Sequence, residues 1–343
     1  MAVSLELELF STCPPPEEAD RATYVKRVRD VAKWCEEAGY QGILVYSDNR
    51  LPDPWILADL ILRNTERLMP LVAVQPVYMH PYTCAKIVTT FGFLHGRRVY
   101  LNMVAGGFKN DLAALNDSTP HDDRYDRVVE YTRIVNELLS RDGPVTFEGK
   151  YYRIHNLRMS PPLQAELLPG VFISGSSPAG LAAAQRLGAT AIKYPQPVDV
   201  EQTVRTEDVR SGIRLGIIAR GTSDEAWAVA IARFPEDRRG HIAHRMAMNV
   251  SDSRWHRQLS SLGERSTQHE DPYWLVPFQN YKTFCPYLVG SYSQVAEELG
   301  RYLALGFSTI ILDIPASREE LDHIQYAVDE AIEASRAVVQ RAL

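Results

Sequence analysis

A turn of small residues joins a short apolar run to an amphipathic helix between residues 171 and 185. Gly175, Ser176 and Ser177 form the turn, and Pro178 opens the helix. The first backbone N–H groups of a helix have no intrahelical partner and carry a partial positive charge, so anions bind there. We therefore expect this turn to hold an anion, most often a phosphate, although many turns of this composition hold no ligand.

A second informative turn follows the apolar run that ends at residue 104. Ala105, Gly106 and Gly107 are small enough to let the main chain approach a planar ring, and Asn102 offers both a donor and an acceptor to a heteroaromatic edge. The alternative is that the glycines only turn the chain. Both turns follow predicted strands, which favours a shared ligand.

The residues at the other predicted strand ends contain little histidine, cysteine or lysine. They include Tyr46, Asp48, Gln75, Tyr194 and Asp313. A hydrolase, a metalloenzyme or a Schiff-base enzyme would place a nucleophile, a metal ligand or an amine there. Amide, hydroxyl and aromatic groups instead indicate a large flat cofactor that supplies the chemistry itself.

These residues must be positioned by a regular alternation of strand-like and helix-like segments. Eight apolar runs are typical of buried parallel strands, and they span residues 3–10, 42–46, 68–76, 98–104, 170–175, 190–194, 214–220 and 309–314. With a hairpin over 144–154 set aside, this pattern predicts an α/β protein, a (β/α)8 TIM barrel. A doubly wound open sheet is the alternative.

We expect residues 1–343 to form a single domain. Residues 235–290 are too long for a loop, and we interpret them as an insertion before the last β/α unit. The helix between Tyr194 and Arg214 is expected to be stunted or missing, because prolines interrupt that segment.

Composition excludes several classes of protein. The chain has 343 residues, a net charge of −6 and a pI of about 5.9, which argues against a nucleic-acid surface and a basic membrane-binding face. Its four cysteines are too far apart for a disulfide framework or a zinc site. There is no signal-peptide pattern at the N-terminus and no membrane-spanning apolar run. These features predict a cytoplasmic protein.

The predicted insertion contains two groups of residues with more than one interpretation. His241, His244 and His256 are expected to lie on a solvated face, because no further ligand follows at a fixed spacing, and we predict no metal. Four aromatic residues form either a lid over a substrate or a packing surface: Trp274, Phe278, Tyr281 and Phe284.

Taken in order, motifs along nearly the whole chain resemble the bacterial luciferase-like flavin-dependent monooxygenases, most closely their alkanesulfonate monooxygenase branch. The motifs are "LMPLVAVQPVYMHPYTCAK", "LHGRRVYLNMVAGG", "VTFEGKYYRI", "VFISGSSPAGLAAAQRLGATAIKYPQP", "IRLGIIARGTSDEAW" and "LVGSYSQVAEELGRYLALGFSTIILDI". The resemblance implies a TIM barrel that uses FMNH2 and O2 through a C4a-(hydro)peroxyflavin. It also implies a separate NAD(P)H:FMN reductase and a homodimer or a higher homo-oligomer.

The resemblance also assigns cofactor residues. Ser176 and Ser177, with Gly175, would hold the FMN phosphate, Tyr125 would donate to it, and Arg124 would lie nearby. The isoalloxazine ring would be lined by Gln75, Asn102, Val104, Ala105 and Gly106.

On the substrate side the sequence departs from the sulfonate enzymes. Their histidine is Gly216 here, and their Tyr-Pro-His at the last strand is Ile314-Pro315-Ala316, although Arg214 is kept. A substrate that is less anionic than a sulfonate is therefore expected. The substrate-side candidates are Arg214, Tyr46, Asp48 and Tyr194. An F420-dependent oxidoreductase and a non-catalytic flavin-binding protein are the alternative functions.

Overall fold

The computed structural model describes residues 7–16, 20–201, 209–250, 254–263 and 272–342. The backbone divides into two compact units. Unit 1 comprises Met1–Thr12, Glu37–Tyr40 and Ile192–Leu343, and unit 2 comprises Cys13–Glu36 and Gln41–Ala191. The single-domain organisation stays a prediction.

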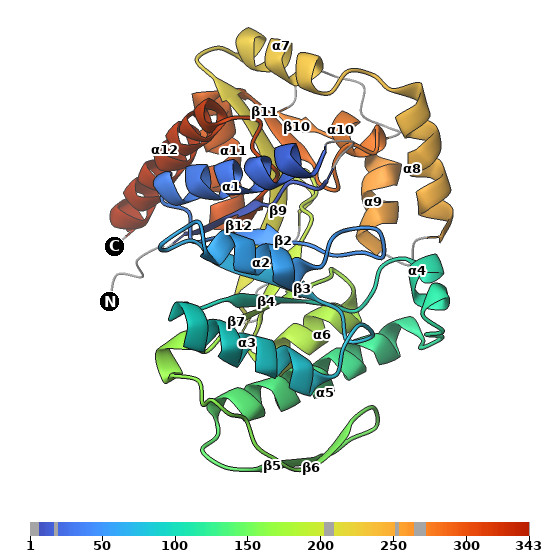
Figure 1. Ribbon diagram of the computed structural model, residues 1–343. Helices are drawn as coiled ribbons and strands as arrows, with labels where there is room; N and C mark the ends of the chain where they lie inside the picture. The colour runs from blue at the N-terminus through green and yellow to red at the C-terminus, as the bar shows by residue number, and fades with distance from the viewer. Residues whose placement is uncertain (1–6, 17–19, 202–208, 251–253, 264–271, 343) are drawn as a thin grey trace. The chain divides into compact units, whose positions relative to one another are not determined.

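The fold is a closed barrel of parallel strands with surrounding helices, as the sequence predicts, and not a doubly wound open sheet. Within the described residues its eight strands are β1 (Glu8–Thr12), β2 (Gly42–Val45), β3 (Met69–Val74), β4 (Tyr100–Val104), β7 (Gly170–Ser174), β8 (Thr190–Lys193), β9 (Ser211–Arg220) and β12 (Phe307–Leu312) (Figure 1). Each of the eight predicted runs overlaps one of these strands, although β1, β9 and β12 extend beyond their runs. Residues 3–6 of the first run lie outside the described residues.

In unit 2 the parallel strands follow the order β2-β3-β4-β7. β2 and β4 are almost wholly buried, which is why they appear in the sequence as continuous apolar runs. The helices are α1 (Arg21–Glu37), α2 (Pro54–Leu62), α3 (Pro81–His95), α4 (Lys109–Ala114), α5 (His121–Ser140) and α6 (Pro178–Leu187), with a 3-10 turn at Ala165–Leu167. α5 packs between α3 and α6 (Figure 1).

Local sequence fixes the beginnings of elements in this unit. The Asp53 carboxylate accepts hydrogen bonds from the backbone N–H groups of Trp55 and Ile56, so it caps α2 as the Asp-Pro pair predicts. The predicted hairpin is present as β5 (Val145–Glu148) and β6 (Arg153–Leu157). The Glu130 carboxylate on α5 accepts from the backbone of its turn at Lys150, which anchors the hairpin to α5.

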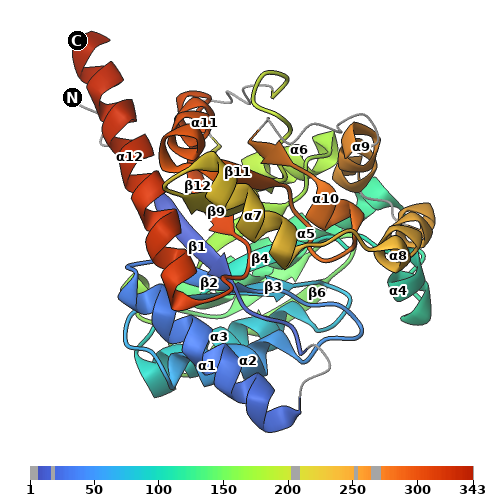
Figure 2. The same ribbon diagram turned by 90° about the horizontal axis from the view of Figure 1, so that it is seen from above.

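In unit 1 the strand order is β1-β12-β9-β11-β10, and all neighbours are parallel except β10 (Tyr273–Trp274) and β11 (Tyr287–Ser291). Its helices are α7 (Ser223–Arg233), α8 (Arg238–Val250), α9 (Arg254–Gly263), α10 (Val276–Gln279), α11 (Tyr292–Ala304) and α12 (Arg318–Ala342). Figure 2 shows α11 and α12 lying side by side. The described residues between β8 and β9 form no helix, and 202–208 lie outside the description.

The predicted insertion includes α8, α9, β10 and α10. One expectation about its histidines is wrong. His244 is buried, not solvated, because its ring packs against Phe278 and its Nε2 lies 2.9 Å from Ser260 Oγ on α9. The side chain of His256 lies outside the described residues. Trp274 and Phe278 are buried as well, so these two aromatic residues pack in the unit and do not form an open lid.

The described residues contain neither a metal-binding cluster nor a membrane-spanning helix. No group of three histidine, cysteine, aspartate or glutamate side chains there is arranged to hold a metal ion. No helix in the described part of the chain is long and apolar enough to cross a membrane.

Candidate active site

In unit 2 the hydroxyl-rich turn after β7 meets Tyr125 on α5. A Cβ atom added to Gly175 would lie 2.2 Å from Tyr125 Oη, so only glycine fits beside this phenol. Ser177 hydrogen-bonds to Tyr125, and its Oγ also accepts from the Gly180 N–H at 3.1 Å, which caps α6. Three predicted phosphate residues, Gly175, Ser177 and Tyr125, are therefore brought together, with Ser176 in the same turn.

A buried cation lies next to Tyr125 in the sequence. Arg124 is 4% exposed, and its Nη1 lies 3.4 Å from the Thr119 carbonyl oxygen. Burial raises the pKa of Tyr125 above its ordinary value, although the hydrogen bond to Ser177 and the charge of Arg124 oppose the shift. The phenol is thus protonated at neutral pH. Two hydroxyl donors, a helix N-terminus and a nearby guanidinium form a donor set that fits a phosphate.

The turn after β4 presents an oriented amide and an open stretch of backbone. Ser174 Oγ donates to Asn102 Oδ1 at 2.8 Å, and this hydrogen bond fixes the orientation of the buried amide. The NH2 group of Asn102 then remains as a donor. Gly106 has φ +96°, a conformation that favours glycine, and a Cβ on Gly107 would meet nothing within 4 Å. With buried Ala105 and half-buried Val104, this backbone fits the edge of a flat ring system.

The ends of β2 and β3 line a cavity of about 290 Å³ in unit 2, and both Asp48 and Gln75 contribute to it. Asp48 Oδ1 accepts from the backbone N–H groups of Arg50 and Leu51, so this carboxylate holds its own turn. Tyr46 lines a second pocket, together with Cys13 and Leu57. The catalytic roles of Tyr46 and Asp48 stay predictions.

Unit 1 contains a buried network of charged and phenolic groups around β9 and the end of β12. Arg214 on β9 donates from Nη1 to Tyr194 Oη at 3.1 Å, and its Nη2 lies 3.8 Å from Asp313 Oδ1. Arg214 and Asp313 are 6% and 9% exposed. The structure therefore joins two predicted residues, Arg214 and Tyr194, and adds a carboxylate that balances the guanidinium charge.

Sequence reasoning missed a fourth member of this network, Tyr287 on β11. Its hydroxyl donates to Asp313 Oδ2 at 2.8 Å, and burial together with the Asp313 carboxylate raises the pKa of this phenol. Its ring occupies the space beside Gly216, where an added Cβ would lie 2.3 Å from the ring. A glycine inside a buried strand is the signal that predicts such a close approach.

The chain is similar to known proteins along most of its length. The family model "Luciferase-like monooxygenase" matches residues 7–309. The 4-(gamma-L-glutamylamino)butanoyl-[BtrI acyl-carrier protein] monooxygenase BtrO of Niallia circulans is 34% identical over 306 residues, 88% of this chain and 89% of BtrO.

Solved structures with lower identity show the same fold. DmoA from Hyphomicrobium sulfonivorans superposes with a TM-score of 0.74 at 16% identity, covering 96% of this chain and 88% of DmoA. An F420-dependent secondary alcohol dehydrogenase superposes with a TM-score of 0.67 at 14% identity, covering 95% of this chain and 99% of the dehydrogenase chain. These two likenesses show the fold alone. The family match and the identity to BtrO show that this chain is an enzyme belonging to the luciferase-like monooxygenase family.

Proposed function

We propose that the protein is an FMNH2- and O2-dependent monooxygenase that receives reduced flavin from a separate NAD(P)H:FMN reductase. The observation that carries the cofactor assignment is the donor set of Tyr125, Ser177 and Arg124 around Gly175. Ser176 and Ser177 would hold the phosphate. Asn102, Gln75 and the backbone of residues 104–106 would line the ring. Bound FMNH2 would reduce O2, so that one oxygen atom enters the substrate and the other leaves as water.

Two alternative functions have different support. A non-catalytic flavin-binding protein is disfavoured by the family and by the named monooxygenase BtrO. An F420-dependent oxidoreductase shares the fold, since one structural neighbour uses that cofactor. FMN is favoured over F420 because the one curated relative named above is a monooxygenase.

For the substrate we propose an acyl group carried on an acyl carrier protein. BtrO, by its name, acts on such a group. The charge balance in unit 1 supports a substrate other than a small sulfonate, because Asp313 already faces Arg214. The buried network of Arg214, Tyr194, Asp313 and Tyr287 would position the substrate and keep bulk water away.

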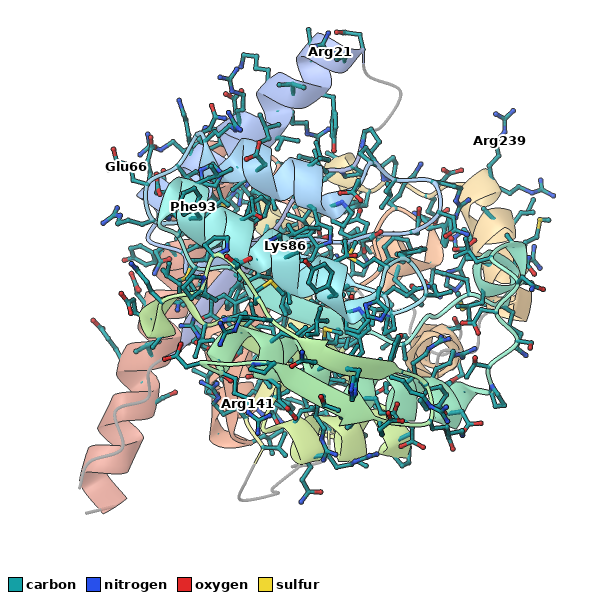
Figure 3. The ribbon with its side chains drawn as sticks, turned by 60° about the horizontal axis from the view of Figure 1, so that its bottom comes forward. Arg21, Glu66, Lys86, Phe93, Arg141 and Arg239 are labelled. Carbon is teal, nitrogen blue, oxygen red and sulfur yellow. The ribbon has the colours of Figure 1, made fainter. Side chains whose placement is uncertain are left out.

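We also propose a homodimer and a cytoplasmic location. Three large apolar side chains on α2 and α3 are exposed to solvent, namely Ile56 at 71%, Phe93 at 73% and Leu94 at 61%. Figure 3 shows Phe93 on the outer surface of α3. A Phe93→Glu variant should shift the mass measured by light scattering from dimer to monomer. A wild-type protein that is a monomer at all concentrations would contradict this proposal.

Oxygen-isotope labelling tests the proposed function. The enzyme would be incubated under 18O2 with NAD(P)H, a flavin reductase, FMN and an acyl carrier protein loaded with the acyl group named for BtrO. One 18O atom should enter the acyl product, and omission of the reductase or FMN should abolish the reaction. Oxidation of an alcohol group under argon with F420 as the acceptor would instead establish the hydride-transfer alternative.

A further inference from the structure

Helix α8 presents arginines and apolar side chains together on its outer face. Arg238, Arg239 and Arg245 are exposed, and so are Ile242 at 46% and Met246 at 67%. At 100° per residue these five positions fall within a stripe of about 120°. We call this set the α8 stripe, and Figure 3 shows Arg239 projecting from it away from the ribbon.

The opposite face of α8 is fixed against the rest of unit 1. A Cβ added to Gly240 would lie 2.0 Å from the Asn280 carbonyl oxygen, so helix and loop are in direct contact. His244 is buried against Phe278 and reaches Ser260. The Asp237 carboxylate accepts from the Gly240 N–H at the helix start and pairs with Lys282. The packed face of α8, with Gly240 and His244, therefore leaves the α8 stripe on the solvent-exposed face of the helix.

The charge of the α8 stripe is opposite to that of the whole chain. The helix has three arginines and no acidic residue, whereas the chain has a net charge of −6. The nearest acidic residues in the sequence are Glu236, which is exposed, and Asp237, which pairs with Lys282. Exposure of Ile242 and Met246 to water costs free energy, which is recovered if a partner covers these side chains.

We propose that the α8 stripe docks an acidic amphipathic helix of the acyl carrier protein that bears the substrate, an inference that rests on the carrier-bound substrate proposed above. Guanidinium groups pair with carboxylates in a two-pronged geometry, so Arg238, Arg239 and Arg245 fit a row of Asp and Glu side chains. Ile242 and Met246 fit the apolar residues that lie between those carboxylates.

The composition of the stripe disfavours two other partners. Nucleic acid offers phosphates to the arginines, but it has no apolar surface to cover Ile242 and Met246. A membrane would accept those two side chains, but two partly exposed residues bury too little apolar area for stable insertion. An acidic helix satisfies both the charged and the apolar members of the stripe.

Binding and turnover measured separately test this docking. A fluorescently labelled holo acyl carrier protein would be titrated with wild type, with Arg238→Glu/Arg239→Glu and with Ile242→Asp. The matched control is Arg21→Glu, an exposed arginine at the start of α1 that Figure 3 also labels. We expect the Kd to rise about tenfold or more in the two stripe variants and to stay unchanged in the control.

Turnover separates docking from the function itself. Each variant would oxidise the same acyl group presented either on the carrier protein or as a short N-acetylcysteamine thioester. The stripe variants should raise KM for the carrier-bound form only. Equal carrier binding by all variants, or wild-type binding to phosphatidylserine vesicles but not to the carrier, would overturn the docking. Wild type that binds the carrier but oxidises neither form would refute the proposed substrate while leaving the docking intact.

Discussion

Unit 2 and unit 1 both pair an arginine with a carboxylate, but in different places. In unit 2 the Arg127–Asp117 pair, with 2.6 Å between Nη2 and Oδ2, joins the second turn of α5 to the loop before this helix. Its strand ends present hydroxyl, amide and backbone groups. In unit 1 the charges of Arg214, inside β9, and Asp313, directly after β12, are joined to two phenols. The first arrangement leaves its strand ends suited to an anionic cofactor, and the second presents a site whose own charges are already balanced.

Gly216→Ala should have the largest effect, because the added Cβ would lie 2.3–2.4 Å from three atoms of the Tyr287 ring in a fully buried strand. Overpacking of this kind costs about 3 kcal/mol of unfolding free energy. Gly221→Ala, where the nearest atom is 3.6 Å away on a flexible glutamate, is the matched control. Urea denaturation measures both. Equal stability of the two variants would show that the position of the Tyr287 ring does not require glycine at residue 216.

Gly175→Ala should act on unit 2 in the same way but less severely, since the clash is with the end of one side chain, Tyr125 Oη. We expect a loss of about 2 kcal/mol and a large rise in the Kd for reduced FMN. Gly221→Ala, whose Cβ would lie 3.6 Å from its nearest neighbour and outside the proposed flavin site, should lower neither stability nor flavin affinity. Unchanged flavin affinity in Gly175→Ala would remove the phosphate site from this turn.

Acid should weaken unit 2 through Asp117. Hydrogen bonds from Arg127 and Thr119 lower its pKa from 3.8 to about 2, so the ionised carboxylate stabilises the folded state at neutral pH. That stability is lost as the pH falls through 3.8 toward 2, and the loss is about 1 kcal/mol at pH 3. Asp117→Asn should flatten this part of the pH profile of unfolding. A profile identical to wild type would contradict the assignment.

Ser177→Ala should have the smallest effect on folding. It removes the hydroxyl that caps α6 at the Gly180 N–H. This loss lowers the free energy of unfolding by about 0.5–1 kcal/mol. Its effect on flavin binding should be larger than its effect on stability, because the same hydroxyl faces Tyr125. Ser177→Thr, which keeps the hydroxyl, should restore both. If Ser177→Thr behaves like Ser177→Ala, the hydroxyl has no part in binding.

The barrel could be predicted because each strand leaves its own local pattern. Runs such as Gly42–Val45 are apolar at every position, which marks strands buried on both faces. The turn that carries the proposed anion site could also be predicted, because residues 175–178 are consecutive and the conformation of their turn depends mainly on local chemistry.

The charge network of unit 1 could not be predicted in the same way. Tyr287 on β11, Gly216 on β9 and Asp313 after β12 are far apart in the sequence, and only the fold brings them together. His244 was placed on the wrong face for a related reason. Helical spacing shows which residues share a face, but the element that covers that face, α10, is known only from the structure.

The most direct test of the account is an anaerobic titration of wild-type protein and Gly175→Ala with photoreduced FMN and, in parallel, with reduced F420. We expect wild type to bind FMNH2 more tightly than oxidised FMN or reduced F420, and Gly175→Ala to lose most of that affinity. Wild-type protein that prefers reduced F420, or that does not bind reduced FMN, would contradict the assignment of the Tyr125–Ser177 site to the flavin phosphate.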